Sequence, residues 1–169
     1  EGATHLRPAF VELLTALPSL GPVMALTRNP SAVHEKRGVY PAPSFDGQVG
    51  LFHSPAIDLR VFLRAWHAAF ALVEPHRGKL RRSLQFFDAQ GEALHKVWLG
   101  DGSDVDAFDT IVRSYRSDLP YAPGPARAAP TPAPLPTPEE VAAFLDAWRK
   151  LQDTHDFFPL LRRFHLDRL

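Results

Sequence analysis

The chain has 169 residues, of which 45% are hydrophobic and 11% aromatic, so it is long enough to form one globular domain with its own core. Lys plus Arg and Asp plus Glu number 19 each, which excludes the overall basic character of nucleic-acid and anionic-membrane binders. The absence of cysteine excludes disulfides, thiolate catalysis and cysteine-ligated metal sites, and no apolar stretch approaches the roughly 20 residues of a membrane-spanning helix.

The first helix is predicted within residues 7–21, where apolar residues recur at helical spacing before Pro and Gly end the pattern. From residue 22 to residue 99 the pattern changes to short β-type runs separated by turn sequences. These runs are PVMALTRN, AVHEKRGVY, QVGLFH, LRVFLRAW, HAAFALVE, RRSLQFFDAQ and ALHKVWL. Because strands do not alternate with helices, we expect an α+β fold with a mainly antiparallel sheet of about six or seven strands flanked by helices.

The C-terminal part of the chain contains two further predicted helices and a proline-rich linker. Residues 101–116 open with Asp and Ser caps and place apolar residues on one side, which predicts a helix. Residues 120–137, PYAPGPARAAPTPAPLPT, predict an extended linker. After it, Thr137 as cap and Pro138 at the first position begin a long helix that is expected to bend or restart at Pro159. The predicted organisation is therefore an α+β body over 1–119, a linker over 120–137 and a helical arm over 138–169.

His155 in this arm is a candidate metal ligand. It continues a series of apolar residues at helical steps of three and four, namely Val141, Phe144, Leu145, Trp148, Leu151 and Phe158. A neutral imidazole beside an apolar wall suits an axial metal ligand. A half-buried core histidine next to a helix kink is the structural alternative.

The arginines that follow His155 are candidate carboxylate-binding residues. Arg162, Arg163 and Arg168 are accompanied by a single acid, Asp167. A planar guanidinium is well shaped to clamp a carboxylate. The alternative is a solvated last helical turn whose cations are favoured by the helix dipole.

A second arginine-containing face is predicted in the run SPAIDLRVFLRAW. Period-2 alternation places on one face Arg60, Phe62, Arg64 and Trp66. This face is either an ordinary solvent face or the wall of a pocket for a flat, partly anionic ligand.

The other histidines share no metal-type spacing and are predicted to occupy ordinary surface or strand positions; they include His34, His53, His67, His76 and His95. No GxSxG, Walker or GxGxxG pattern occurs, so a serine hydrolase or a nucleotide-binding enzyme has no support.

Four sequence blocks resemble one known family. The blocks are VMALTRNPSAVHEKRGVY, IDLRVFL followed by a Trp, SLQFFDAQGEALHKVW and DTHDFFPLLRR. In this order they are similar to the bacterial hemin-degrading factors, also called cytoplasmic haem-transport proteins of the HemS and ChuS type, over most of residues 10–169. The resemblance implies an antiparallel sheet with helices, haem (iron protoporphyrin IX) as ligand, a cytoplasmic location, and a chain that corresponds to the first of two similar halves.

The resemblance also implies site residues. His155 in the Asp-x-His-x-Phe-Phe block resembles the axial ligand of the haem iron, and Arg60 in Asp-Leu-Arg resembles the distal residue. Arg168 resembles a partner of a haem propionate. The arm residues expected to contact the macrocycle are Trp148, Leu151 and Phe158.

Three functions fit these features. Haem binding and intracellular trafficking is the favoured one. A haem-degrading oxygenase, with Arg60 as the distal catalytic residue and an external electron donor, is the alternative. A non-catalytic structural or dimerisation fragment of a two-repeat protein is the third.

Haem is the expected ligand, and three protein partners are considered: a haem-donating membrane transporter, a haem oxygenase and a reductase. A second copy of the chain would replace the second half of the family's proteins. Neither nucleic acid nor stable membrane insertion is expected.

Overall fold

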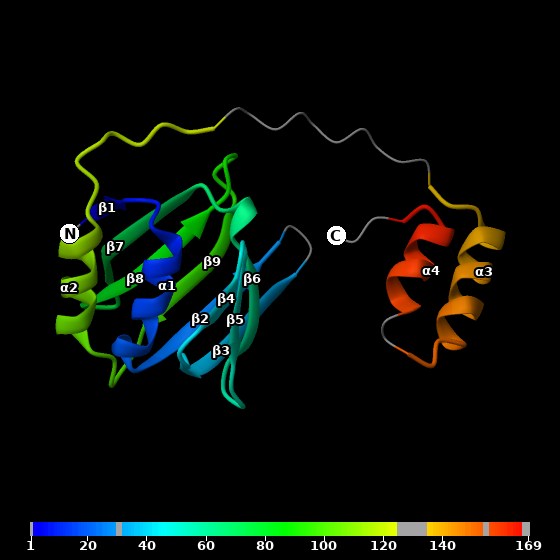
Figure 1. The fold of residues 1–169 in the computed structure, drawn as a ribbon, viewed down its shortest axis with the longest axis horizontal. Coiled ribbons are helices and arrows are strands. Elements are labelled where there is room, and N and C mark those ends of the chain that lie inside the picture. The colour runs from blue at the N-terminus through cyan, green and yellow to red at the C-terminus, as the bar shows by residue number, and fades with distance from the viewer. Residues whose placement is uncertain (1, 30–31, 125–134, 154–155, 167–169) are drawn as a thin grey trace. The chain divides into compact units, whose positions relative to one another are not determined.

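The computed structural model describes residues 2–29, 32–124, 135–153 and 156–166 and is drawn in Figure 1. The chain forms two compact units, Glu1–Arg127 and Ala128–Leu169. Among the described residues, no helix is long and apolar enough to cross a membrane. Of the predicted linker, residues 125–134 lie outside the described part of the chain.

The first unit is built on two antiparallel sheets. One has six strands in the order β1-β7-β8-β9-β2-β3, and the other has three strands in the order β4-β5-β6. Their bounds are β1 (Gly2–Leu6), β2 (Pro22–Arg28), β3 (Val33–Val39), β4 (Ser44–Asp46), β5 (Val49–His53), β6 (Asp58–Phe62), β7 (Ala68–His76), β8 (Lys79–Phe87) and β9 (Ala93–Leu99). The predicted α+β class and the mainly antiparallel sheet are confirmed, and the small sheet is an addition to the prediction.

Four short helical segments complete the first unit: α1 (Phe10–Ala16), the 3₁₀ helix η1 (Leu17–Leu20), the 3₁₀ helix η2 (Leu63–Ala65) and α2 (Val105–Tyr115). The carboxylate of Asp104 caps α2 by accepting a hydrogen bond from the backbone N–H of Ala107 at 2.8 Å. Figure 1 shows α1 lying across the six-stranded sheet. Both predicted helices of this unit are therefore present, and the first of them ends as a 3₁₀ turn.

One apolar core joins these helices to both sheets. It includes residues that are at most 5% exposed, among them Leu13, Leu17, Phe52, Val61, Phe86, Val97 and Phe108. Because apolar burial stabilises by roughly 25 cal/mol per Å², this cluster is the main source of stability of the unit. Through Val61 and Phe52 it also holds the small sheet in place.

A polar network lies inside this apolar core. The His95 imidazole is hydrogen-bonded through Nε2 to the Tyr40 hydroxyl at 2.6 Å and through Nδ1 to the Thr27 hydroxyl at 3.0 Å. The rings of Trp66 and Phe86 stack near it, with centroids 6.2 Å away. Burial lowers the pKa of His95 from 6.5 to about 4, so the imidazole is neutral at pH 7. His95 occupies a strand, as predicted, but it is buried rather than at the surface.

This histidine makes the stability of the fold dependent on pH. The folded pKa of His95 is about 4 and the unfolded pKa is 6.5, so its contribution is complete above about pH 6.5 and is lost as the pH falls toward 4. We expect the free energy of unfolding to fall by about 2 kcal/mol between pH 7 and pH 5 through this residue. Urea titrations at several pH values measure this change in the free energy of unfolding. His95→Gln, which cannot titrate, should flatten the dependence, and an unchanged slope in that variant would contradict the assignment.

The second unit contains α3 (Pro138–Arg149) and α4 (Phe157–Arg163). The predicted start of α3 is confirmed, because the Thr137 hydroxyl accepts from the Glu140 N–H at 3.2 Å and the Glu140 carboxylate accepts from the Thr137 N–H at 2.8 Å. The two helices meet through ring contacts, with centroids of Phe144 and Phe164 5.4 Å apart and those of Trp148 and Phe157 5.2 Å apart.

The arm was predicted as one long helix that bends or restarts at Pro159, and the structure shows a restart, with two separate helices in place of one bent helix. Pro159 has no N–H and therefore fits only the first turn of a helix without loss of a hydrogen bond. It is the third residue of α4, which fits a new helix that begins at Phe157, while α3 has already ended at Arg149. As a result Leu151 lies beyond α3 and does not continue the apolar face that ends at Trp148.

Candidate functional site

Arg60 lies on the outward face of the three-stranded sheet. It is exposed, and it faces Leu51 of β5 across the strand pair, while Phe62 faces Val49. Directly opposed residues share one face of a sheet, so Arg60 shares its face with Val49, Leu51 and Phe62. The same face also carries Asp58 and His53, whose side chains lie 3.4 Å apart. Arg60 makes no hydrogen bond or ion pair with any residue that the structure describes. This combination of an unpaired cation and an apolar surface suits a flat ligand with an apolar body.

The inward face of the same strand is buried, as the alternating pattern predicted. Val61 is 5% exposed, whereas Phe62 is 57% exposed. The alternation ends at Phe62, because η2 turns the chain before Trp66. The placement of Trp66 on the Arg60 face is therefore wrong: its ring packs in the core, 5.7 Å from the Phe10 ring and 4.6 Å from the Phe86 ring. Arg64, in η2, is exposed.

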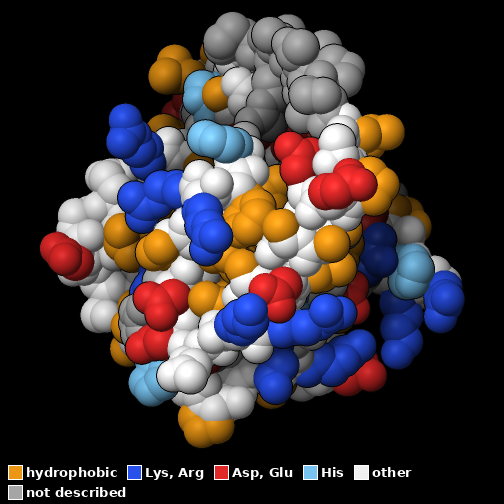
Figure 2. Space-filling view, turned by 90° about the vertical axis from the view of Figure 1, so that its right-hand side faces the viewer, with side chains coloured by type: hydrophobic (Ala, Val, Ile, Leu, Met, Phe, Trp, Pro, Cys, Tyr) orange, Lys and Arg blue, Asp and Glu red, His pale blue; other side chains and the backbone are white. Residues whose placement is uncertain are grey.

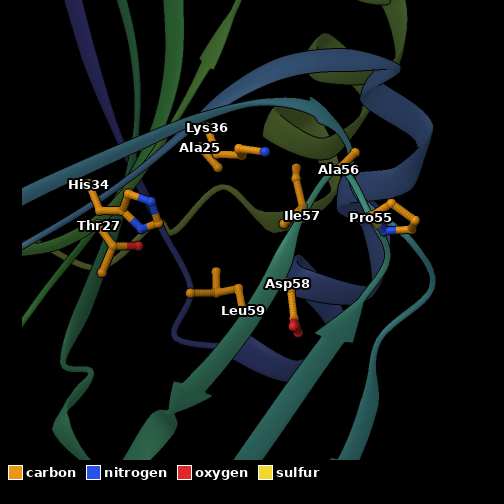
Figure 3. Close-up of a pocket in the computed structure, with 9 residues that line it drawn as sticks. All are labelled: Ala25, Thr27, His34, Lys36, Pro55, Ala56, Ile57, Asp58 and Leu59. Atoms are coloured by element: carbon orange, nitrogen blue, oxygen red, sulfur yellow. The ribbon is translucent and has the colours of Figure 1, made fainter.

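A small pocket opens between the two sheets next to β6 (Figure 3). His34 and Thr27, which pair across β3 and β2, form one wall, and Asp58 and Leu59 of β6 form another. Its volume is about 180 Å³. Pockets that enclose drug-sized ligands measure roughly 300–1,000 Å³, so this space is too small to enclose a macrocycle. A macrocycle at Arg60 would need a second surface to cover it.

The arm residues lie in the second unit. His155 and Arg168 lie outside the described residues. Trp148 and Phe158 are 48% and 45% exposed, and both flank Phe157, with centroid distances of 5.2 Å and 6.3 Å. The arm thus presents aromatic surface close in sequence to His155.

Two of the three arginines that follow His155 are described. Arg162 and Arg163 are exposed in the last turn of α4, and neither forms an ion pair with a described residue. The Arg163 guanidinium lies 5.4 Å from the Phe164 ring centroid. Both the carboxylate clamp and the solvated helix end remain compatible with this geometry. On the face seen in Figure 2, basic, acidic and hydrophobic side chains are interspersed, in line with the balanced charge of the chain.

Two neighbours of Arg60 are absent from the site predicted from the sequence. Val49 and Leu51 belong to the run QVGLFH, whose alternation showed that they share a face but not which strand they oppose. No group of three or more potential metal-ligating side chains is present among the described residues.

The comparisons with known proteins agree on one family. Residues 1–115 match the model described as the haemin-degrading HemS.ChuX domain. The hemin transport protein HmuS of Yersinia pestis is 42% identical over 173 residues, covering 98% of this chain and 48% of that protein. The chain therefore spans about half the length of the curated relatives it matches.

Solved structures show the same likeness. Holo-PhuS, a heme-binding protein from Pseudomonas aeruginosa, is 42% identical with a TM-score of 0.74, covering 99% of this chain and 49% of that chain. ChuS, described as an E. coli heme oxygenase, is 32% identical with a TM-score of 0.74, covering 99% of this chain and 50% of that chain. The resemblance inferred from the four sequence blocks is confirmed by these matches.

Proposed function

The chain belongs to the haemin-degrading HemS/ChuX domain family, and we propose that it binds haem and passes it on in the cytoplasm during haem-iron utilisation. The observation that carries this proposal is the Arg60 face, where an exposed arginine without an ion-pair partner among the described residues shares one sheet face with Leu51, Val49 and Phe62. The names of the relatives, which include a hemin transport protein and a heme-binding protein, support the same ligand.

In this proposal the arm supplies the axial ligand. Bound haem offers an iron that accepts a neutral imidazole and two propionates that attract cations. His155 would hold the iron, and Arg168 would bind a propionate. Trp148, Leu151 and Phe158 would contact the macrocycle, for which two of them offer exposed aromatic area.

Arg60 would act on the opposite side of the macrocycle. Its guanidinium carries five N–H donors in a planar fork, so it can donate hydrogen bonds there. The surrounding apolar side chains would exclude water from that side.

The chain covers only half of its relatives, so completion of the site needs another surface. A second copy of this chain is one proposed source of that surface. A haem-donating membrane transporter and a haem oxygenase or reductase are the proposed partners for delivery and onward transfer.

Titration of the chain with haemin, followed by absorption in the Soret region, tests the binding proposal. We expect a saturable, histidine-type Soret band. Addition of a reductant in air then separates two functions: a stable band supports the carrier, and loss of the band with release of a bilin, unaffected by catalase, supports the oxygenase named for one relative. Absence of any saturable band would contradict both and leave the structural-fragment function.

Replacement of Arg60 by alanine is expected to alter the distal side while haem stays bound. Because a single hydrogen bond contributes about 0.5–1.5 kcal/mol net, haem affinity should fall by no more than about tenfold. Absorption and electron paramagnetic resonance spectra should nevertheless change, since a hydrogen-bond donor is lost. Arg64→Ala, which removes a neighbouring exposed arginine, should change neither quantity. Complete loss of binding in Arg60→Ala would show that this residue holds the ligand or the fold instead.

A further inference from the structure

A second concave surface lies at one end of the six-stranded sheet. Pairing of β8 with β9 begins at Ser83 and Trp98, so Lys79–Arg82 pair with β7 alone. The β7–β8 hairpin therefore extends past the end of β9 and leaves a groove of about 610 Å³ beside it. This volume falls within the roughly 300–1,000 Å³ that small-molecule sites occupy. The groove is not lined by Arg60 or by any residue of the arm.

The groove is strongly basic, although the chain as a whole has no net charge. Five cationic residues line it: Arg37, Arg77, Lys79, Arg81 and Arg82. Of these, only Arg81 forms an ion pair with a described residue, Glu74. The groove is lined by one acid, Asp101, among the residues that the structure describes. Four like charges without acidic partners raise the local potential and favour a negatively charged ligand.

Several of these cations are held in place by the fold. Arg77 and Gly78 have φ values of 49° and 76°, as in the tight two-residue turns that suit twisted hairpins, and this presents Arg77 at the hairpin tip. The Arg81 guanidinium donates to the Glu74 carboxylate and lies 4.1 Å from the Trp98 ring centroid. The Nε of Arg82 is buried and has no hydrogen-bond partner among the described residues, which restricts the stem of this side chain while its residue lines the groove.

We propose that this groove binds a small polyanion that carries at least two phosphate or carboxylate groups. Guanidinium groups bind such oxygens in a bidentate manner, and several cations within one groove select a ligand with more than one charge. This site goes beyond the proposed haem function and is independent of it. The competing explanation is that the cations only protect an unpaired strand edge from aggregation.

Isothermal titration calorimetry of the chain with tripolyphosphate and with citrate, at low and high salt, tests the proposal. We expect at least one of them to bind, and binding to weaken as salt screens the charges. Binding of tripolyphosphate alone identifies phosphate as the ligand chemistry, binding of citrate alone identifies carboxylate, and binding of both indicates recognition of clustered charge. Each of these three results supports the site.

Lys79→Gln and Arg82→Lys locate the ligand. Each substitution should lower the affinity for the anion about tenfold. Lys79→Gln removes a charge, and Arg82→Lys removes the bidentate fork while keeping the charge. Arg113→Gln removes a cation of α2 that does not line the groove and should have no effect. The proposal is overturned if neither anion binds, or if the two groove variants bind as the parent does. Aggregation of Lys79→Gln with unchanged anion affinity would establish edge protection instead.

Discussion

Replacement of His155 by alanine is expected to abolish the histidine-type Soret band and to weaken haem binding by roughly two orders of magnitude. Even changes beside a metal ligand cost about 10–100-fold in affinity, so loss of the ligand itself should cost at least as much. The free energy of unfolding should be unaffected, because this proposal gives His155 a role in binding the ligand and none in the fold. Absorption titration and urea unfolding measure the two quantities.

His165→Ala is the matched control for this change. His165 is an exposed histidine that follows α4, ten residues beyond His155. Its replacement should leave both the spectrum and the affinity unchanged. If His155→Ala retains the parent spectrum while His165→Ala loses it, the ligand has been assigned to the wrong residue.

Replacement of Trp66 by alanine should destabilise the first unit by about 3 kcal/mol, at the lower end of the range for truncating a packed Trp. Its ring contacts Phe10, Phe86 and His95, so the change leaves a cavity where a helix meets the large sheet. The midpoint of urea unfolding measures the loss. Truncation of a haem-contacting residue on the Arg60 face would instead lower haem affinity and change stability little.

Phe62→Ala is the comparison that separates these two roles. Phe62 is 57% exposed beside Arg60, so its truncation should cost less than about 1 kcal/mol in stability. Haem affinity should fall instead. A large loss of stability in Phe62→Ala together with a small one in Trp66→Ala would contradict the packing described for η2 and β6.

Strands with an apolar pattern of their own could be predicted from the sequence. Each of the seven predicted runs overlaps one strand, namely β2, β3 and β5–β9 in chain order. The strands β1 and β4 were not predicted. Leu6 is the sole buried side chain of β1, and β4 has three residues, so neither shows a period of its own. Their pairing with β7 and β5 decides their structure.

The site was only partly predictable for a similar reason. The exposed position of Arg60 and Phe62 follows from alternation along β6, but the turn at η2 that moves Trp66 into the core leaves no mark in that alternation. The partners Val49 and Leu51 depend on the register between β5 and β6, which residue spacing within one strand does not determine. In the arm, Pro159 correctly indicated an interruption, whereas its place in the first turn of α4 depends on contacts between the two helices.

The central claim, haem between His155 and Arg60, is tested most directly by quenching of a fluorophore by bound haem. The chain has no cysteine, so Arg64→Cys and Arg113→Cys each accept a single maleimide dye, the first in η2 directly after β6 and the second on α2. The proposed site predicts that haemin quenches the dye at position 64 far more strongly than the dye at position 113, and that His155→Ala removes the difference. Equal quenching at both positions, or a difference that persists without His155, would contradict it.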